Sequence, residues 1–211
     1  MDGTLLDTRL DIARAANLAR QELGLPAMTV EEVVRAVGDG VNLFVSRVTY
    51  PQSDARFNHA RSVFLRHYGE NIHGETKPYA GILDSVDSLH KLGYPMAIVS
   101  NKPANLVDEL VDYFKWQDLF QTWLGGDSAP KAKPAADPIW LALEKMGLPE
   151  SHPVIMIGDG DQDILVAKSV QARAIWCAWG FNVNPTNEYE FKTVNHPSDL
   201  VLVVKDYAEN S

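Results

Sequence analysis

The sequence contains very little cysteine and no long apolar run. Cys177 is the only cysteine among the 211 residues, so an internal disulfide is impossible and a reducing compartment, the cytoplasm, is the predicted location. Cys177 lies in the apolar run 174–178, which favours a buried structural thiol over a nucleophile. No run approaches the roughly 18 to 20 apolar residues of a membrane span, and the N-terminus lacks a signal pattern. We therefore predict a soluble protein without a membrane partner.

Positive charge is also scarce. Lysine and arginine number 19 against 28 aspartates and glutamates, which gives a formal net charge of −9. This balance argues against a nucleic-acid backbone as a partner. A small anionic substrate remains compatible with it, provided that basic groups gather locally. The six histidines show no metal-ligand spacing with one another or with Cys177, and the chain has no internal repeat.

Residues 10–75 have the pattern of a small all-helical unit. Alanine and leucine are frequent at its start, and Thr29 with Glu32 forms a capping box that opens a second helix. Further apolar side chains recur at helical spacing. The expected helices cover residues 10–25, 29–38, 41–49 and 54–68.

Strands alternate with helices in the remainder of the chain. This alternation predicts an α/β fold, a doubly wound parallel sheet interrupted by the helical insertion. We expect residues 1–9 and 76–211 to form the α/β core domain and residues 10–75 to form a second, helical domain. The expected strands are 96–99, 122–124, 154–157, 174–178 and, as an edge strand, 200–204; the expected helices are 82–92, 106–114, 137–146 and one running through 165–168.

Polar residues follow several of the expected strands. Three carboxylates fall within residues 159–163, directly after what reads as a buried strand, and crowded carboxylates of this kind need a cation, most simply Mg²⁺. Residues 100–102 and the loop with Lys131 and Lys133 offer a hydroxyl, an amide and ammonium groups, which suit a phosphate. Ligands bind outside the carboxyl ends of parallel strands. Together these segments predict phosphoryl chemistry.

Four short motifs occur in order along the chain. They are Asp2-Gly3-Thr4-Leu5-Leu6-Asp7-Thr8, Ser100-Asn101-Lys102-Pro103, Lys133-Pro134, and Gly158-Asp159 with Asp163. In this order the motifs resemble those of the haloacid dehalogenase (HAD) superfamily of Mg²⁺-dependent phosphohydrolases, and within it the phosphoglycolate phosphatase-like branch with a helical cap. The resemblance extends from Asp2 to about Val204 and implies that the helical insertion is this cap.

The resemblance implies a role for each of five residues. Asp2 falls at the general acid/base and Thr4 at the threonine of the phosphate loop. The Ser100 hydroxyl and the backbone amide of Asn101 would bind the transferring phosphoryl group. Lys133 would neutralise the nucleophile and the phosphate. The implied reaction is hydrolysis of a small phosphoester, 2-phosphoglycolate first, through an aspartyl-phosphate intermediate.

The resemblance also implies a metal site and a specificity loop. Asp159 and Asp163, with Asp2, would hold Mg²⁺. Gly38-Asp39-Gly40 falls where the cap of these enzymes carries its substrate-specificity loop, although Asp39 could merely end a helix. Asp161 is an extra carboxylate that could be an outer-shell group or, as we favour, a helix cap.

One residue of the family pattern is absent. The nucleophilic aspartate stands two residues before the acid/base, which places it directly ahead of Met1, and the apolar strand that carries it is absent too. We expect that the native protein has an upstream segment ending in aspartate, and that this chain reflects a misassigned start or a truncation rather than a true loss. As printed, the chain is expected to bind phosphate and Mg²⁺ weakly and to lack most of its hydrolytic activity.

Several alternatives remain open. Lys131 competes with Lys133, although the adjacent Pro134 favours Lys133. Other capped reactions, such as dephosphorylation of sugar phosphates or nucleotides and sugar-phosphate mutation, are compatible with the motifs. A non-catalytic phosphate-binding protein is a further reading, and dehalogenation is the least favoured. The expected partner is a small phosphoester, with the protein a monomer or homodimer.

Overall fold

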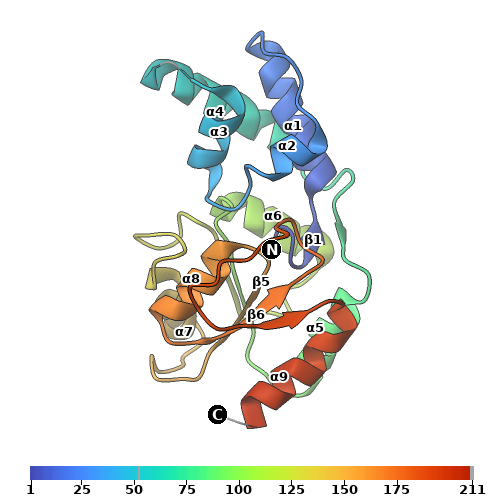
Figure 1. Cartoon of the computed structure of the whole chain (residues 1–211), viewed down its shortest axis with the longest axis vertical. Coiled ribbons are helices and arrows are strands. Elements are labelled where there is room, and N and C mark those ends of the chain that lie inside the picture. The colour runs from blue at the N-terminus through green and yellow to red at the C-terminus, as the bar shows by residue number, and fades with distance from the viewer. Residues whose placement is uncertain (52, 210–211) are drawn as a thin grey trace.

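Four helices form a group at one end of the molecule. The computed structural model describes residues 1–51 and 53–209, and α1 packs against α2 and α4 while α3 packs against α4. This group lies beyond the carboxyl ends of the strands (Figure 1). The expected capping box is confirmed, because the Glu32 amide donates to Thr29 Oγ1 and the Thr29 amide donates to Glu32. The helices are α1 (Arg9–Glu22), α2 (Val30–Val34), α3 (Val41–Thr49) and α4 (Asp54–Gly69).

The other part of the chain is an α/β layer structure, as expected. Its strands pair in parallel, β3 with β4, and β6 with both β5 and β7. Among the described residues, none of the helices is both long and apolar enough to cross a membrane. The strands are β3 (Ala97–Val99), β4 (Thr122–Leu124), β5 (Ile155–Gly158), β6 (Arg173–Cys177) and β7 (Lys192–Val194); the helices are α5 (Ile82–Lys91), α6 (Ala104–Phe114), α7 (Asp137–Lys145), α8 (Asp161–Ser169), α9 (Leu200–Glu209) and the short 3₁₀ helix η1 (Pro197–Asp199).

Helices cover both faces of the sheet. Successive side chains of a strand point to opposite faces, and along β6 Trp176 clusters with Ile164 of α8, whereas Ile175 belongs to the cluster that contains Leu200 of α9. In Figure 1, α7 and α8 accordingly lie on the opposite side of the strands from α5 and α9. The doubly wound arrangement therefore follows from the alternation within a single strand.

Strands β3 to β7 fall into two hydrogen-bonded groups. Within residues 1–51 and 53–209, no ladder joins β3 to β5. Three of the four residues of β5 are consequently only half-buried, whereas Ala174–Cys177 of β6, which has a neighbour on each side, are buried. The expectation that β5 is a buried strand was wrong for this reason.

The expected edge strand at residues 200–204 was also wrong. These residues begin α9, and the edge strand is β7, which lies just before them. Leu200 and Val204, four residues apart, are buried, whereas Leu202 is 72% exposed. That spacing is helical, and the β-branched composition of the segment conceals it.

Two short strands connect the helical group to the sheet. In β1 (Leu6–Asp7) and β2 (Lys77–Pro78) the chain leaves for the helical group and returns from it, and the two strands pair antiparallel. Asp11, at the start of α1, accepts hydrogen bonds from the backbone amides of Glu75 and Thr76. Both connections are thus held together where they enter the helical group.

Candidate functional site

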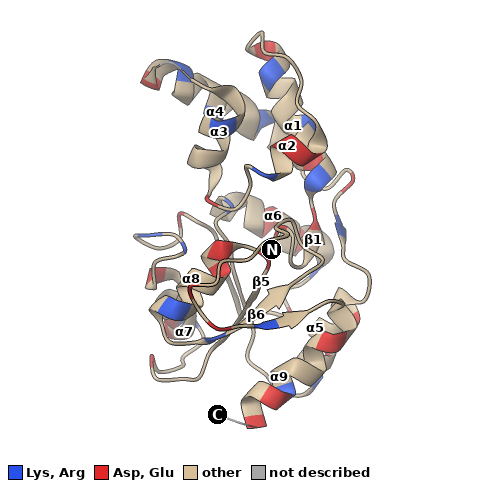
Figure 2. Ribbon diagram, viewed as in Figure 1, with Lys and Arg blue, Asp and Glu red and all other residues tan. Residues whose placement is uncertain are grey.

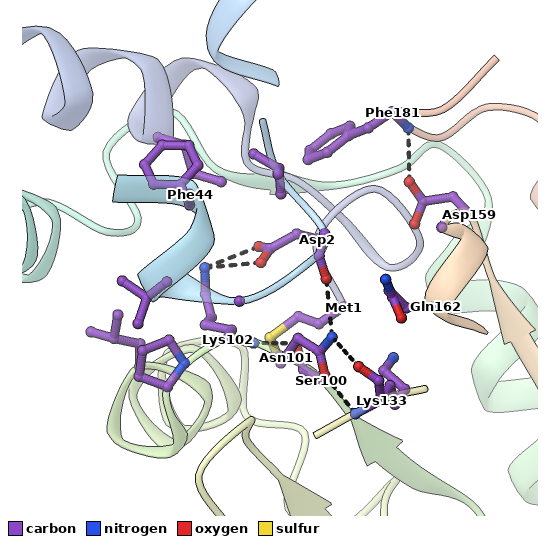
Figure 3. Close-up of a pocket in the computed structure, with 18 of the residues that line it drawn as sticks. Met1, Asp2, Phe44, Ser100, Asn101, Lys102, Lys133, Asp159, Gln162 and Phe181 are labelled. Carbon is purple, nitrogen blue, oxygen red and sulfur yellow. Dashed lines mark hydrogen bonds and ion pairs between the residues drawn. The ribbon is translucent and has the colours of Figure 1, made fainter. Parts of the chain in front are cut away.

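A pocket lies between the carboxyl ends of the strands and the helical group. Its lining contains most of the residues singled out in the sequence, although they come from segments far apart in the chain (Figure 3). Thr4 and Asp39 do not line it. The residues that do are Asp2, Ser100, Asn101, Lys133, Asp159, Asp163, Gly38 and Gly40.

Ser100 and Asn101 follow β3 and have different surroundings. Ser100 is buried, its backbone amide donates to the Leu124 carbonyl over 2.9 Å, and its hydroxyl accepts from the Lys102 amide over 3.2 Å. The Asn101 side chain exchanges 3.0 Å hydrogen bonds with the backbone N–H and C=O of Lys133 and donates to the Gly38 carbonyl. Asn101 therefore connects three loops around the pocket.

Lys133 is the buried lysine of its loop. Its ammonium donates to Asp163 Oδ1 over 2.6 Å and to the Val99 carbonyl over 2.7 Å. Lys131 is exposed and does not line the pocket. The geometry thus agrees with the preference for Lys133, and it places one positive charge against the acids that follow β5.

Asp159 is held in a tight polar setting. The Thr4 hydroxyl donates to its Oδ1 over 2.7 Å and the Phe181 amide to its Oδ2 over 2.8 Å. Thr4, expected in a phosphate loop, is thus directed at Asp159. Burial, followed by the negative charge of Asp163, raises the pKa of Asp159 to about 6.

Two glycines allow the chain to pass close to Asp159. A Cβ at Gly3, whose φ is +74°, would lie 2.0 Å from Asp159 Oδ2, and a Cβ at Gly180 would lie 2.1 Å from Asp159 Cβ. No side chain fits at such separations. The two loops can therefore enclose this carboxylate only because both positions are glycine.

The first turn of α8 contains two acidic residues with different hydrogen-bond partners. Asp163 accepts from the Gly160 amide over 3.0 Å and so caps the helix. Asp161, which we favoured as the cap, instead accepts from the Thr186 amide over 2.8 Å and stabilises a neighbouring loop. Figure 2 shows the acidic residues at this end of α8. The prediction for Asp161 was wrong because the sequence does not show which of two nearby acids turns back toward the helix start.

Asp2 is paired with Lys102, which the sequence analysis grouped with the polar residues that suit a phosphate. The Lys102 ammonium lies 3.1 Å from each Asp2 carboxylate oxygen and 2.6 Å from the Tyr68 hydroxyl of α4. Burial alone would raise the pKa of Asp2, but nearby ammonium groups, that of Lys102 first, hold it below its ordinary value. The signal for Lys102 was its place two residues after Ser100.

Asp39 contacts the core without entering the pocket. It pairs with Arg47 of α3 and accepts a hydrogen bond from Gln162 of α8. The flanking glycines, Gly38 and Gly40, line the pocket itself. Gln162 was not singled out from the sequence, because nothing in its neighbourhood distinguishes it from a solvent-facing residue of a first helical turn.

Two carboxylates, those of Asp159 and Asp163, could supply oxygen ligands to a metal ion, whereas that of Asp2 is turned toward Lys102. Asp2, Asp159 and Asp163 all line the pocket, and the mutual repulsion of the last two is the electrostatic setting that a divalent cation relieves. Across residues 1–51 and 53–209, however, no three histidine, cysteine, aspartate or glutamate side chains are grouped closely enough to hold an ion. The oxygen donors are of the kind that Mg²⁺ prefers, but each acid here is bound to a protein donor, so these side chains would have to turn toward one another to hold the ion.

Comparisons with known proteins agree with this geometry. A family model described as haloacid dehalogenase-like hydrolase matches residues 1–177. A phosphoglycolate phosphatase of Photobacterium profundum is 35% identical over 86% of this chain and 82% of its own, and one of Aquifex aeolicus is 31% identical over 98% and 95%. The crystal structure of a predicted phosphoglycolate phosphatase from Haemophilus somnus covers 97% of this chain and 95% of its own, with 25% identity and a TM-score of 0.88.

Proposed function

Because the chain belongs to the haloacid dehalogenase-like hydrolase family, we propose that it acts as a phosphatase on small phosphomonoesters, with 2-phosphoglycolate the first candidate. The observation that carries this proposal is the convergence of Ser100, Lys133 and the two acids Asp159 and Asp163 on one pocket at the strand ends. The names of the relatives support the choice of substrate.

The residues of the pocket would have different roles in such a reaction. The Ser100 hydroxyl and the Asn101 backbone amide would bind the phosphoryl oxygens, and the Lys133 ammonium would offset their charge. The resemblance gives Asp2 the role of general acid and base: it would protonate the leaving alkoxide and later take a proton from the attacking water. Because Lys102 favours the ionised carboxylate, the arrangement described above suits the second of these steps. A Mg²⁺ ion held by Asp159 and Asp163, with Asp2, would further stabilise the charge on the phosphoryl oxygens.

The helical group would act as the cap over this site. Hydrogen bonds already join it to the core, among them those from Asn101 to Gly38, from Gln162 to Asp39 and from Lys102 to Tyr68. Closing residues 10–75 over a bound ester would exclude bulk water and strengthen the electrostatic interactions inside. Gly38, Asp39 and Gly40 are the residues through which the cap would discriminate between substrates.

Turnover requires a nucleophile in addition to these groups. The resemblance places it directly before Met1, outside the printed sequence. We propose that an aspartate at that place forms the aspartyl-phosphate intermediate, whereas ligand binding needs only the residues described above. Without that aspartate, the chain should bind phosphoesters weakly and hydrolyse little of them.

Phosphate release by an extended protein tests the proposal. About five apolar residues followed by aspartate would be added ahead of Met1, and a matched protein would carry asparagine in place of that aspartate. With Mg²⁺ and a panel of phosphomonoesters, we expect release by the aspartate form alone, with 2-phosphoglycolate among the best substrates. Release from no ester would contradict the phosphatase, and a poor rate with 2-phosphoglycolate would contradict the choice of substrate.

A further inference from the structure

Lys102 and Tyr68 occupy the side of the pocket away from the phosphoryl-binding groups. Figure 3 shows the Lys102 ammonium on the Phe44 side of Asp2, whereas Asp159 lies on the opposite side. If the phosphoryl group sits near Ser100 and Asp159, the alcohol part of the ester must extend toward Lys102. This side of the pocket is therefore where the leaving group is recognised.

The charge on Lys102 is not explained by packing. Its side chain is only 3% exposed, and its ammonium is hydrogen-bonded to Asp2 and Tyr68 and lies 4.4 Å from the centre of the Tyr68 ring. Burying an ammonium group costs free energy even when it is paired, and an apolar side chain of similar size usually serves stability as well or better. Asp2 compensates this charge, and the remaining ammonium hydrogen, which is directed at the Tyr68 hydroxyl, is the one that an anionic ligand would take.

The Tyr68 hydroxyl provides a second donor at the same point. It accepts the hydrogen bond from Lys102, so its own proton is left over, and within the described part of the chain no acceptor is bonded to it. Tyr68 itself is 3% exposed and lines the pocket. An unused donor beside a buried cation is a combination that suits a carboxylate.

The walls around these two groups are apolar. Phe44 and Phe64 line the same side of the pocket with ring centroids 4.8 Å apart, and the Phe64 ring stacks on that of Tyr68 at 5.6 Å. Hydrogen bonds to charged groups are stronger in such surroundings than in water, which helps to offset the cost of removing water from a carboxylate, while bulky leaving groups are disfavoured. The shape and the dielectric both favour a short carboxylic acid.

We propose that Lys102 and Tyr68 bind a carboxylate on the alcohol part of the substrate, and so select phosphate esters of short hydroxy acids over esters of uncharged alcohols. The ammonium hydrogen now directed at Tyr68 and the phenolic hydrogen are the two donors, while Asp2 keeps its contacts with the same ammonium. This assignment rests on the proposed function, because it needs the phosphoryl group at the Ser100 and Lys133 end.

Binding of intact esters to the printed chain tests the assignment. Calorimetric titration with 2-phosphoglycolate and with ethyl phosphate, in the presence of Mg²⁺, compares two ligands that differ in the carboxylate. The variants are Lys102→Met and Tyr68→Phe, the second of which leaves the pairing of Lys102 with Asp2 in place. Tyr79→Phe is the matched control, since the Tyr79 hydroxyl is buried without a partner and lies outside the pocket.

The expected result is a loss confined to the ligand with the carboxylate. Losing a hydrogen bond to a charged group should weaken 2-phosphoglycolate about tenfold in Tyr68→Phe, with ethyl phosphate changed less than about twofold. Lys102→Met should weaken 2-phosphoglycolate at least as much, and because it also leaves Asp2 without its partner, the comparison between the two esters is made in Tyr68→Phe. Equal affinity of the parent for both esters, or equal losses for both in Tyr68→Phe, would overturn the assignment and leave the proposed function standing. If neither ester bound to the parent, the assignment would fail, whereas phosphate release by the extended protein decides the proposed function separately.

Discussion

Replacing Asp11 by alanine should lower the free energy of unfolding by about 3 to 5 kcal/mol. The Asp11 side chain is fully buried, and its Oδ2 accepts from the Glu75 amide at 2.9 Å and from the amide and hydroxyl of Thr76 at 2.8 Å each. Its Oδ1 pairs with Arg14 at 2.7 Å. Each buried donor left without a partner costs about 1 to 3 kcal/mol, and Arg14 is exposed enough to regain water. The sum therefore stays below that of four independent bonds.

Urea unfolding of the printed chain, followed by circular dichroism, measures this loss. For a chain of this length a destabilisation of about 3 to 5 kcal/mol corresponds to a fall in Tm of roughly 10 °C. Asp11→Asn keeps an oxygen for Glu75 and Thr76 and should lose only about 1 to 2 kcal/mol. Asp118→Ala, at an exposed position, should stay within about 0.5 kcal/mol of the parent. A change below about 1 kcal/mol for Asp11→Ala would refute the reasoning.

Two further predictions concern the acids of the pocket. Mg²⁺ at about one hundred times its dissociation constant should raise the free energy of unfolding by about 2.7 kcal/mol. Thermal melts with and without a chelator measure this increase. Asp159→Asn and Asp163→Asn should abolish it, and Asp161→Asn should retain it. Gly3→Ala should displace Asp159 and weaken Mg²⁺ binding in a calorimetric titration. Gly24→Ala is the control, because Gly24 has a similar φ of +70° but no atom within 4 Å of the added Cβ. Equal losses of Mg²⁺ affinity in both variants would contradict a collision at Asp159.

Local signals predicted the helices well. The limits 41–49 match α3, because Gly40 precedes its first turn and the apolar periodicity ends at Thr49. The convergence of Ser100, Lys133 and Asp163 was also predictable, since parallel strands bring their carboxyl ends to one edge. In both cases the information lies within a few residues or in a topological rule.

Contacts between the helical group and the core could not be predicted in this way. Tyr68 reaches Lys102 only because α4 packs against α1 and ends above the pocket, and helical periodicity says nothing of where a helix end lies. The partial exposure of β5 could not be predicted either, because the burial of a strand depends on its neighbours in the sheet. The prediction of a strand at 200–204 was wrong for a local reason, because the pattern of its β-branched residues is compatible with both a strand and a helix.

Three of the polar contacts that join the helical group to the core begin at residues that line the pocket. Asn101 and Gln162 bind the loop 38–40, and Lys102 binds Tyr68. Such bonds contribute about 1 kcal/mol each, so together they favour the closed arrangement only modestly. A ligand can shift the balance further by no more than its differential affinity for the two arrangements. An ester that contacts Lys133 at one end and Tyr68 at the other binds the closed arrangement more tightly, because only that arrangement offers both contacts. Inorganic phosphate is too small to make both contacts and has no such differential affinity. Discrimination between leaving groups and closure of the cap would then have one physical origin.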